Sequence, residues 1–217
     1  MSKNRRQGHA RERRILSRRQ ARRPPYPRIL IVCEGRKTEP LYFDDIRKQN
    51  RIPSAHVSVI PSGSGTEPRQ VVEFAIAEFE KSRAFEWVFP VFDRDSHRTY
   101  GAALQHARNN DRQLRNDEGV AVRFVAVPSV PCFELWILIH FMEVHHGYPR
   151  AELIRTLKQH IPGYTKSTEG IYALTEPHLD IAVRNAEQLR KRFTPDNGED
   201  PYTGVDFLVS LLRTLRD

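Results

Sequence analysis

The sequence is poor in cysteine and has neither a long apolar run nor an apolar segment near its first residue. Its two cysteines, Cys33 and Cys132, lie in apolar stretches, so we expect no disulfide framework and a reducing, cytoplasmic environment. Because no run of 18 or more apolar residues occurs, no membrane span and no membrane partner are expected. A secretory signal is not expected either, since residues near the N-terminus lack an apolar h-region.

Apolar residues are nevertheless plentiful enough to form a core. They make up 39% of the 217 residues, which excludes a wholly disordered chain and suits one domain, with or without a helical extension. The formal net charge of +8 is concentrated at one end, because residues 1–25 hold ten Lys or Arg residues and one acid, Glu12. The remaining chain is therefore close to neutral.

We interpret residues 1–27 as an Arg-rich flexible arm, since they contain few apolar residues and end near Pro24-Pro25. Such an arm attracts the phosphates of nucleic acids through counterion release and adds affinity with little sequence preference. Alternative partners of the arm are an acidic protein or membrane headgroups, and a further alternative is a solvated arm with no partner.

The middle of the chain alternates between predicted strands and helices. We predict strands at residues 29–33, 56–60, 86–92 and 121–127, with helical spacing of apolar residues after each of the first three. This order predicts an α/β fold over residues 28–130, with a parallel sheet between helices and right-handed crossovers. The tripeptide Thr-Glu-Pro occurs at 38–40, 66–68 and 175–177, and we interpret each copy as a helix start capped by threonine.

Residues 131–217 are predicted to be mainly helical. An apolar stretch at 132–141 suits a buried helix, while residues 150–161, 178–193 and 205–215 have amphipathic spacing. Residues 194–204 are rich in turn-forming residues and are predicted to form a loop. The sequence leaves open whether these helices form a separate domain.

Acidic residues follow two of the predicted strands directly. Glu34 follows the first strand, and Asp93 and Asp95 follow the third. Carboxyl ends of parallel strands open on one edge of the sheet, so these carboxylates are expected to converge if the two strands are neighbours. Converging carboxylates repel one another unless a cation is bound, and their hard oxygen atoms suit Mg²⁺ or Mn²⁺. We therefore predict a metal site made of Asp93, Asp95 and Glu34.

Several neighbouring residues suit a phosphate-containing substrate. Gly35 would allow close approach of the backbone to a phosphate, and Lys37 and Arg94 would supply positive charge. His97 is either a hydrogen-bond donor to the phosphate of the substrate or a surface residue at a helix start. Glu134 is either a further catalytic acid at the metal site or an acid favoured by the first turn of its helix.

Four motifs together resemble the RloB (AbiLii-like) family. They are ILIVCEG at 29–35, KTEP-x-YF at 37–43, VFDRD-x-H at 91–97 and PCFELW at 131–136, of which the last is the most specific. The resemblance covers roughly residues 28–215.

This resemblance implies a Toprim-like fold, the Mg²⁺-binding module of topoisomerases, primases and small nucleases. In Toprim proteins a Glu ends the first strand and Asp-x-Asp ends the third, which corresponds to Glu34, Asp93 and Asp95. The family is associated with bacterial anti-phage and abortive-infection loci, often beside a large ATPase. The resemblance thus implies a nuclease or toxin of antiviral defence that such an ATPase controls.

One residue departs from the simple strand pattern. Pro90 lies within the third predicted strand and has no N–H group, so we expect a bulge or an outward-facing nitrogen just before the Asp pair.

The function that these features favour is metal-dependent hydrolysis of a nucleic-acid phosphodiester, with Glu34 as a metal ligand or as a general acid/base. A non-catalytic regulatory or nucleic-acid-binding subunit of an ATPase complex is the main alternative. Haloacid-type phosphatases also use Asp-x-Asp, but after the first strand. The sequence does not distinguish DNA from RNA, nor does it give the oligomeric state.

Overall fold

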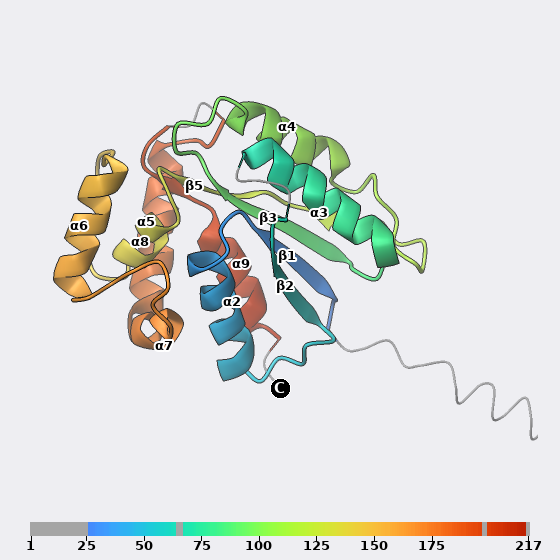
Figure 1. The fold of residues 1–217 in the computed structure, drawn as a ribbon, viewed down its shortest axis with the longest axis horizontal. Helices are drawn as coiled ribbons and strands as arrows, with labels where there is room; N and C mark the ends of the chain where they lie inside the picture. The colour runs from blue at the N-terminus through green and yellow to red at the C-terminus, as the bar shows by residue number, and fades with distance from the viewer. Residues whose placement is uncertain (1–25, 64–66, 197–198, 216–217) are drawn as a thin grey trace, which may run out of the picture.

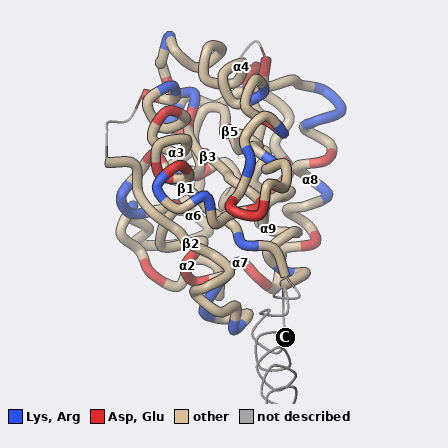
Figure 2. The backbone as a smooth tube through the Cα atoms, turned by 90° about the vertical axis from the view of Figure 1, so that its right-hand side faces the viewer, with Lys and Arg blue, Asp and Glu red and all other residues tan. Residues whose placement is uncertain are grey.

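The computed structural model describes residues 26–63, 67–196 and 199–215 of the chain (Figure 1). The predicted arm therefore lies outside the described residues except for its last two positions. Within the described chain, basic and acidic residues are interspersed along the backbone (Figure 2). This agrees with the near-neutral charge expected for the folded part.

A single sheet forms the centre of the fold. Its strand order is β2-β1-β3-β5-β6, and β4 pairs with β3 beside this path. The strands are β1 (Ile29–Cys33), β2 (Val57–Pro61), β3 (Trp87–Asp93), β4 (Arg123–Phe124), β5 (Val127–Val130) and β6 (Tyr202–Thr203). All pairings are parallel except that of β5 with β6. The predicted α/β fold with a mostly parallel sheet is confirmed.

The predicted strand over residues 121–127 is in fact β4 followed by a break and the first residue of β5, and Pro90 explains the break. The Val91 carbonyl accepts from the Glu34 N–H, whereas the Val88 carbonyl accepts from the Val125 N–H, so these residues face opposite neighbours. Backbone groups alternate along a strand, and Pro90 therefore faces the same side as Val88. The gap between β4 and β5 lies there, so the missing N–H interrupts the neighbouring strand. The pairing of β3 with β1 continues through Pro90 without a bulge.

Helices cover both faces of the sheet (Figure 1). One face is covered by α3 (Pro68–Ser82) and α4 (Tyr100–Asn110). The opposite face is covered by α2 (Thr38–Gln49) together with the C-terminal helices. These are α5 (Glu134–Leu138), α6 (Arg150–His160), α7 (Ile171–Thr175), the 3₁₀ helix η1 (Glu176–His178), α8 (Leu179–Arg192) and α9 (Val205–Arg213).

The three Thr-Glu-Pro segments do not behave alike. Pro68 is the first residue of α3, as predicted, although Thr66 lies outside the described residues. Thr38 is the first residue of α2, but its hydroxyl donates to the Lys166 carbonyl and does not cap the helix. Thr175 ends α7 and its hydroxyl donates back to the Ile171 carbonyl. A tertiary contact and a helix-internal hydrogen bond thus replace the predicted caps at Thr38 and Thr175.

The helical C-terminal part shares its core with the sheet. Alternate residues of β1 point to opposite faces, and those on the α2 face pack in one cluster with buried residues of α5 to α9. Trp136 on α5 donates from Nε1 to the Tyr42 hydroxyl on α2 at 2.8 Å. The loop predicted over residues 194–204 also contributes β6 to the sheet. None of the described helices is long and apolar enough to cross a membrane.

Candidate metal site and active site

The carboxyl ends of β1 and β3 lie side by side, because these strands are parallel neighbours. The Asp93 N–H donates to Glu34 Oε2 at 2.8 Å, which ties the first acid to the end of the third strand. The convergence expected from the order of the strands is therefore present. A single hydrogen bond joins residues that are 59 positions apart in the sequence.

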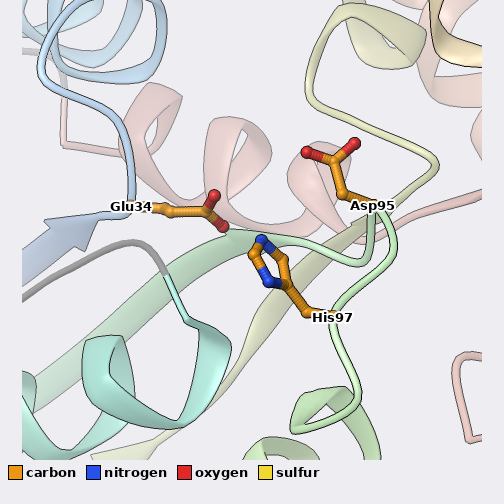
Figure 3. A group of neighbouring side chains, drawn as sticks. All are labelled: Glu34, Asp95 and His97. Carbon is orange, nitrogen blue, oxygen red and sulfur yellow. The ribbon is translucent and has the colours of Figure 1, made fainter.

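Asp95 lies in a tight turn after β3. Its φ angle is 39°, in the left-handed region that aspartate tolerates better than most residues. Two backbone hydrogen bonds fasten the turn to the segment after β5, from the Arg94 N–H to the Ser129 carbonyl and from the Asp95 N–H to the Pro131 carbonyl. The turn brings the Asp95 side chain back over the edge of the sheet, toward Glu34 (Figure 3).

His97 completes a group of three possible metal ligands. One ligand atom from each of Glu34, Asp95 and His97 lies within 4.8 Å of the other two (Figure 3). His97 Nδ1 lies 3.1 Å from Glu67 Oε1, and Glu67 also accepts a hydrogen bond from the Thr99 hydroxyl. These bonds lower the pKa of Glu67, so this carboxylate accepts a hydrogen bond from Nδ1–H and leaves Nε2 free to bind a metal ion.

Three further carboxylates form the buried wall of the same cavity. Asp93, Glu39 and Glu134 are 5%, 7% and 1% exposed. Glu39 packs so closely on Gly35 that a Cβ atom there would lie 2.4 Å from its Oε2. The cavity has a volume of about 420 Å³. It is lined by Glu34, Gly35, Arg36, Lys37, Thr38, Glu39, Asp93, Asp95, His97, Phe133, Glu134, Arg150 and Lys166.

Burial and mutual repulsion raise the pKa values of three of the cavity acids, Glu34, Asp93 and Glu39. Burial raises the pKa of Glu34 to about 7, with smaller contributions from Glu39 and Asp95, although the Asp93 N–H opposes the shift. Burial also raises the pKa of Asp93 well above its usual range, and the charges of Glu39, Glu34 and Glu134 add to this. The pKa of Glu39 is raised for the same reasons. The cavity therefore favours a bound cation.

Arg150 contacts three of the five acids that line the cavity. It lies at the start of α6, where Nη1 pairs with Asp95 Oδ2 and Nη2 lies 3.7 Å from Asp93 Oδ2 and 3.9 Å from Glu134 Oε2. The Tyr164 hydroxyl is 3.5 Å from Glu134 Oε1, whereas Glu134 Oε2 has no hydrogen-bond partner among the described residues. The Glu134 side chain thus lies beside the other acids of the cavity, and its role is not limited to stabilising the first turn of α5.

The residues predicted to bind substrate divide between two cavities. Gly35, Lys37 and His97 line the cavity with the acids, and Lys37 Nζ donates to the Ser167 hydroxyl at 2.9 Å. Arg94 does not line this cavity but lies in the adjoining one. The prediction placed Asp93 among the metal ligands, and the structure groups His97 with Glu34 and Asp95 in that role.

A family model described as RloB-like protein matches residues 29–212, which is most of the chain. The chain belongs to the RloB-like family. The resemblance inferred from the four motifs is therefore confirmed. No curated protein and no solved structure matches this RloB-like chain.

The side chains of this RloB-like protein fit a hard divalent cation. Glu34 and Asp95 offer oxygen atoms, and His97 offers a nitrogen atom held in place by Glu67. Glu134 offers Oε2, which lies near Arg150 but has no hydrogen-bond partner among the described residues. Carboxylate-rich sites of this kind suit Mg²⁺ or Mn²⁺. Glu39, Glu67 and Arg150 were not predicted as site residues, and only their acidic or basic character hinted at such a role.

Proposed function

We propose that this protein is a metal-dependent phosphodiesterase that cleaves nucleic acid. The observation that carries the proposal is one cavity at the carboxyl edge of the sheet, in which Glu34, Asp95 and His97 lie within metal-binding distance of one another. Three more buried acids surround this group. A Toprim-like arrangement, with a Glu after β1 and an Asp-x-Asp motif that begins at the last residue of β3, agrees with this proposal.

Each residue of the cavity has a chemical task in this proposal. Bound Mg²⁺ or Mn²⁺ would supply positive charge that stabilises the reacting phosphate. Asp95 and His97 hold the ion, and Glu67 keeps His97 in the tautomer that can bind it. Glu34 would be the third ligand of the ion, and its pKa of about 7 in the metal-free protein lets it release its proton near neutral pH when the ion binds.

Cations around the cavity would hold the substrate. Lys37 and Lys166 line the same cavity as the acids and can contact phosphate oxygens. Arg150 rests on Asp95 and lies near Asp93 and Glu134. Once a metal ion neutralises these acids, the Arg150 guanidinium is available for the phosphate, which it can bind through two N–H groups.

Cleavage of a panel of DNA and RNA with Mg²⁺ or Mn²⁺ tests the proposal. We expect Glu34→Gln and Asp95→Asn to abolish cleavage without unfolding the protein, and EDTA to do the same to the wild type. Glu73→Gln is a matched control, because Glu73 is exposed on α3 and pairs with Arg69. Wild-type cleavage rates in the Glu34 and Asp95 variants would refute the catalytic assignment and favour a non-catalytic binding subunit.

The family resemblance supports a wider role. We propose that the nuclease acts in anti-phage defence by abortive infection under the control of a large ATPase encoded nearby. The cleavage panel should therefore be run with and without that ATPase. Co-expression toxicity that depends on Glu34 would support this role, and toxicity that is unchanged in Glu34→Gln would contradict it.

A further inference from the structure

A second cavity adjoins the one that contains the acids. Its volume is about 810 Å³, within the range of small-molecule sites. Asp95, His97 and Arg150 line both cavities, so a substrate whose phosphate lies at the acids can extend directly into the second space. The additional polar lining comes chiefly from Arg94, Tyr148 and Asp200.

Arg94 brings an unused hydrogen-bond donor to this cavity. Its backbone N–H is bonded to the Ser129 carbonyl, which fixes the residue in the turn after β3. Its side-chain Nε atom is buried and has no hydrogen-bond partner among the described residues. Leaving a buried donor unpaired is unfavourable, and a ligand with an acceptor atom would remove that cost.

Asp200 brings an unused acceptor. Its carboxylate packs against the backbone of Gly147, where a Cβ atom would lie only 2.9 Å from Cγ and Oδ2. Burial raises the pKa of Asp200, while Arg94 and the Tyr148 N–H lower it. Oδ1 is buried and has no hydrogen-bond partner within the described part of the chain. Glycine at position 147 thus permits a carboxylate to lie where it can receive a donor from a ligand.

An aromatic surface lies beside these two groups. Tyr148 lines the cavity, and its ring is stacked on His146 with centroids 4.8 Å apart and planes at 24°. Stacked rings present a flat apolar face, and nucleic-acid bases bind such faces by stacking. The cavity therefore combines a donor, an acceptor and a stacking surface next to the proposed position of the phosphate.

We propose that the second cavity binds the base of the nucleotide that flanks the cleaved phosphate. Arg94 donates to an acceptor on the edge of the base, Asp200 accepts from a neighbouring N–H, and Tyr148 contacts its face. A guanine edge suits the pair well, because its O6 acceptor is next to N–H donors. This inference rests on the proposed function, since it places the cleaved phosphate at the carboxylates of the first cavity.

Binding of short single-stranded oligonucleotides tests this inference with Ca²⁺ in place of Mg²⁺, which keeps a cation at the acids, and gel electrophoresis checks that the strands stay intact. Each oligonucleotide carries one abasic site at a different position, in DNA and in RNA form, and binding is measured by fluorescence anisotropy. We expect one abasic position to weaken binding to the wild type by about tenfold, as loss of a stacked base does. Tyr148→Ala, which removes the stacking surface, should bind the intact and abasic strands equally, and Arg94→Gln and Asp200→Asn should distinguish them less than the wild type does.

Two matched controls come from the same segments of the chain. Arg98→Gln and Asp196→Asn change exposed residues that line neither cavity, and Asp196 pairs with Arg108 at the surface. Both controls should still distinguish the abasic strand. The inference is overturned if the wild type binds every abasic strand as tightly as the intact strand. It is also overturned if Arg94→Gln and Asp200→Asn, with native circular dichroism spectra, distinguish intact from abasic strands as strongly as the wild type does.

The same proteins assayed for cleavage with Mg²⁺ separate this inference from the proposed function. Cleavage without any effect of an abasic site would refute the base site alone. Base-dependent binding without cleavage of any substrate would support the base site and count against the nuclease.

Discussion

Replacing Arg150 by glutamine should destabilise the metal-free protein in a way that depends on pH. Arg150 is the cation that pairs with Asp95 and lies near the buried acids Asp93 and Glu134. Glutamine is a shorter, neutral side chain that keeps two N–H donors, so the substitution removes the charge together with most of the hydrogen-bonding capacity. The substitution therefore tests whether the acids need a neutralising cation.

The size of the effect follows from the distances. Arg150 Nη2 lies 3.7 Å from Asp93 Oδ2 and 3.9 Å from Glu134 Oε2. A pair of opposite charges about 4 Å apart is worth about 4 kcal/mol at an effective dielectric constant of about 20. The Arg150 side chain is 30% exposed, and the acids can take up protons when it is lost. We therefore expect the free energy of unfolding to fall by about 2–4 kcal/mol at about pH 8.

The sign of the pH dependence is set by Asp93. Burial and neighbouring acids raise its pKa in the folded state, and Arg150 opposes that rise. Without Arg150 the folded protein holds this proton up to a higher pH, so stability falls more steeply as the pH rises. The difference between variant and wild type should shrink at about pH 5, because the raised pKa of Asp93 favours its protonated form in both proteins.

Urea unfolding at the two pH values, in EDTA, measures this difference. Arg155→Gln is the matched control, because Arg155 is exposed on the same helix and lies 4.0 Å from Glu152. Addition of Mn²⁺ should stabilise Arg150→Gln more than the wild type, since the ion no longer competes with the guanidinium. An equal loss of stability at both pH values, or an equal loss in Arg155→Gln, would refute the electrostatic explanation.

Three other changes test separate parts of the account. Glu67→Gln should weaken Mn²⁺ affinity by about tenfold in calorimetry, because it loosens the orientation of His97, and unchanged affinity would contradict this role. Gly35→Ala should displace the carboxylate of Glu39, because the added methyl group would lie 2.4 Å from its Oε2. Cleavage should then be slower although the circular dichroism spectrum stays native, and a wild-type cleavage rate would show that Glu39 is dispensable. Deleting residues 1–25 should make nucleic-acid affinity less dependent on salt, and an unchanged salt slope would show that these residues do not contact phosphates.

The sheet and the first acids of the site were predictable from local sequence. Apolar runs marked the strands, and an acid placed directly after a strand lies at the sheet edge whatever the rest of the chain does. Glu34, Asp93 and Asp95 follow that rule. The broken strand near residue 125 was not predicted, because the effect of Pro90 falls on the neighbouring strand and depends on which side its nitrogen faces.

The rest of the site depends on how the helices pack. Arg150 lies 55 positions after Asp95 and reaches it only because α6 begins beside the turn after β3. Glu67 and Glu39 both looked like acids at helix starts, and their helices do begin there. Their contacts with His97 and Gly35 come from the placement of α3 and α2 on the sheet, which local sequence does not specify.

Calorimetric titration of the metal-free protein with Mn²⁺ tests the central claim most directly. We predict saturable binding that Glu34→Gln and Asp95→Asn abolish and that Glu73→Gln leaves unchanged. Glu34, with a pKa of about 7, must lose its proton to bind the ion. Binding should therefore release protons at about pH 6.5 and few at about pH 8.5, measured in buffers of different ionisation enthalpy. Absence of saturable binding, or wild-type affinity in Glu34→Gln, would contradict the account.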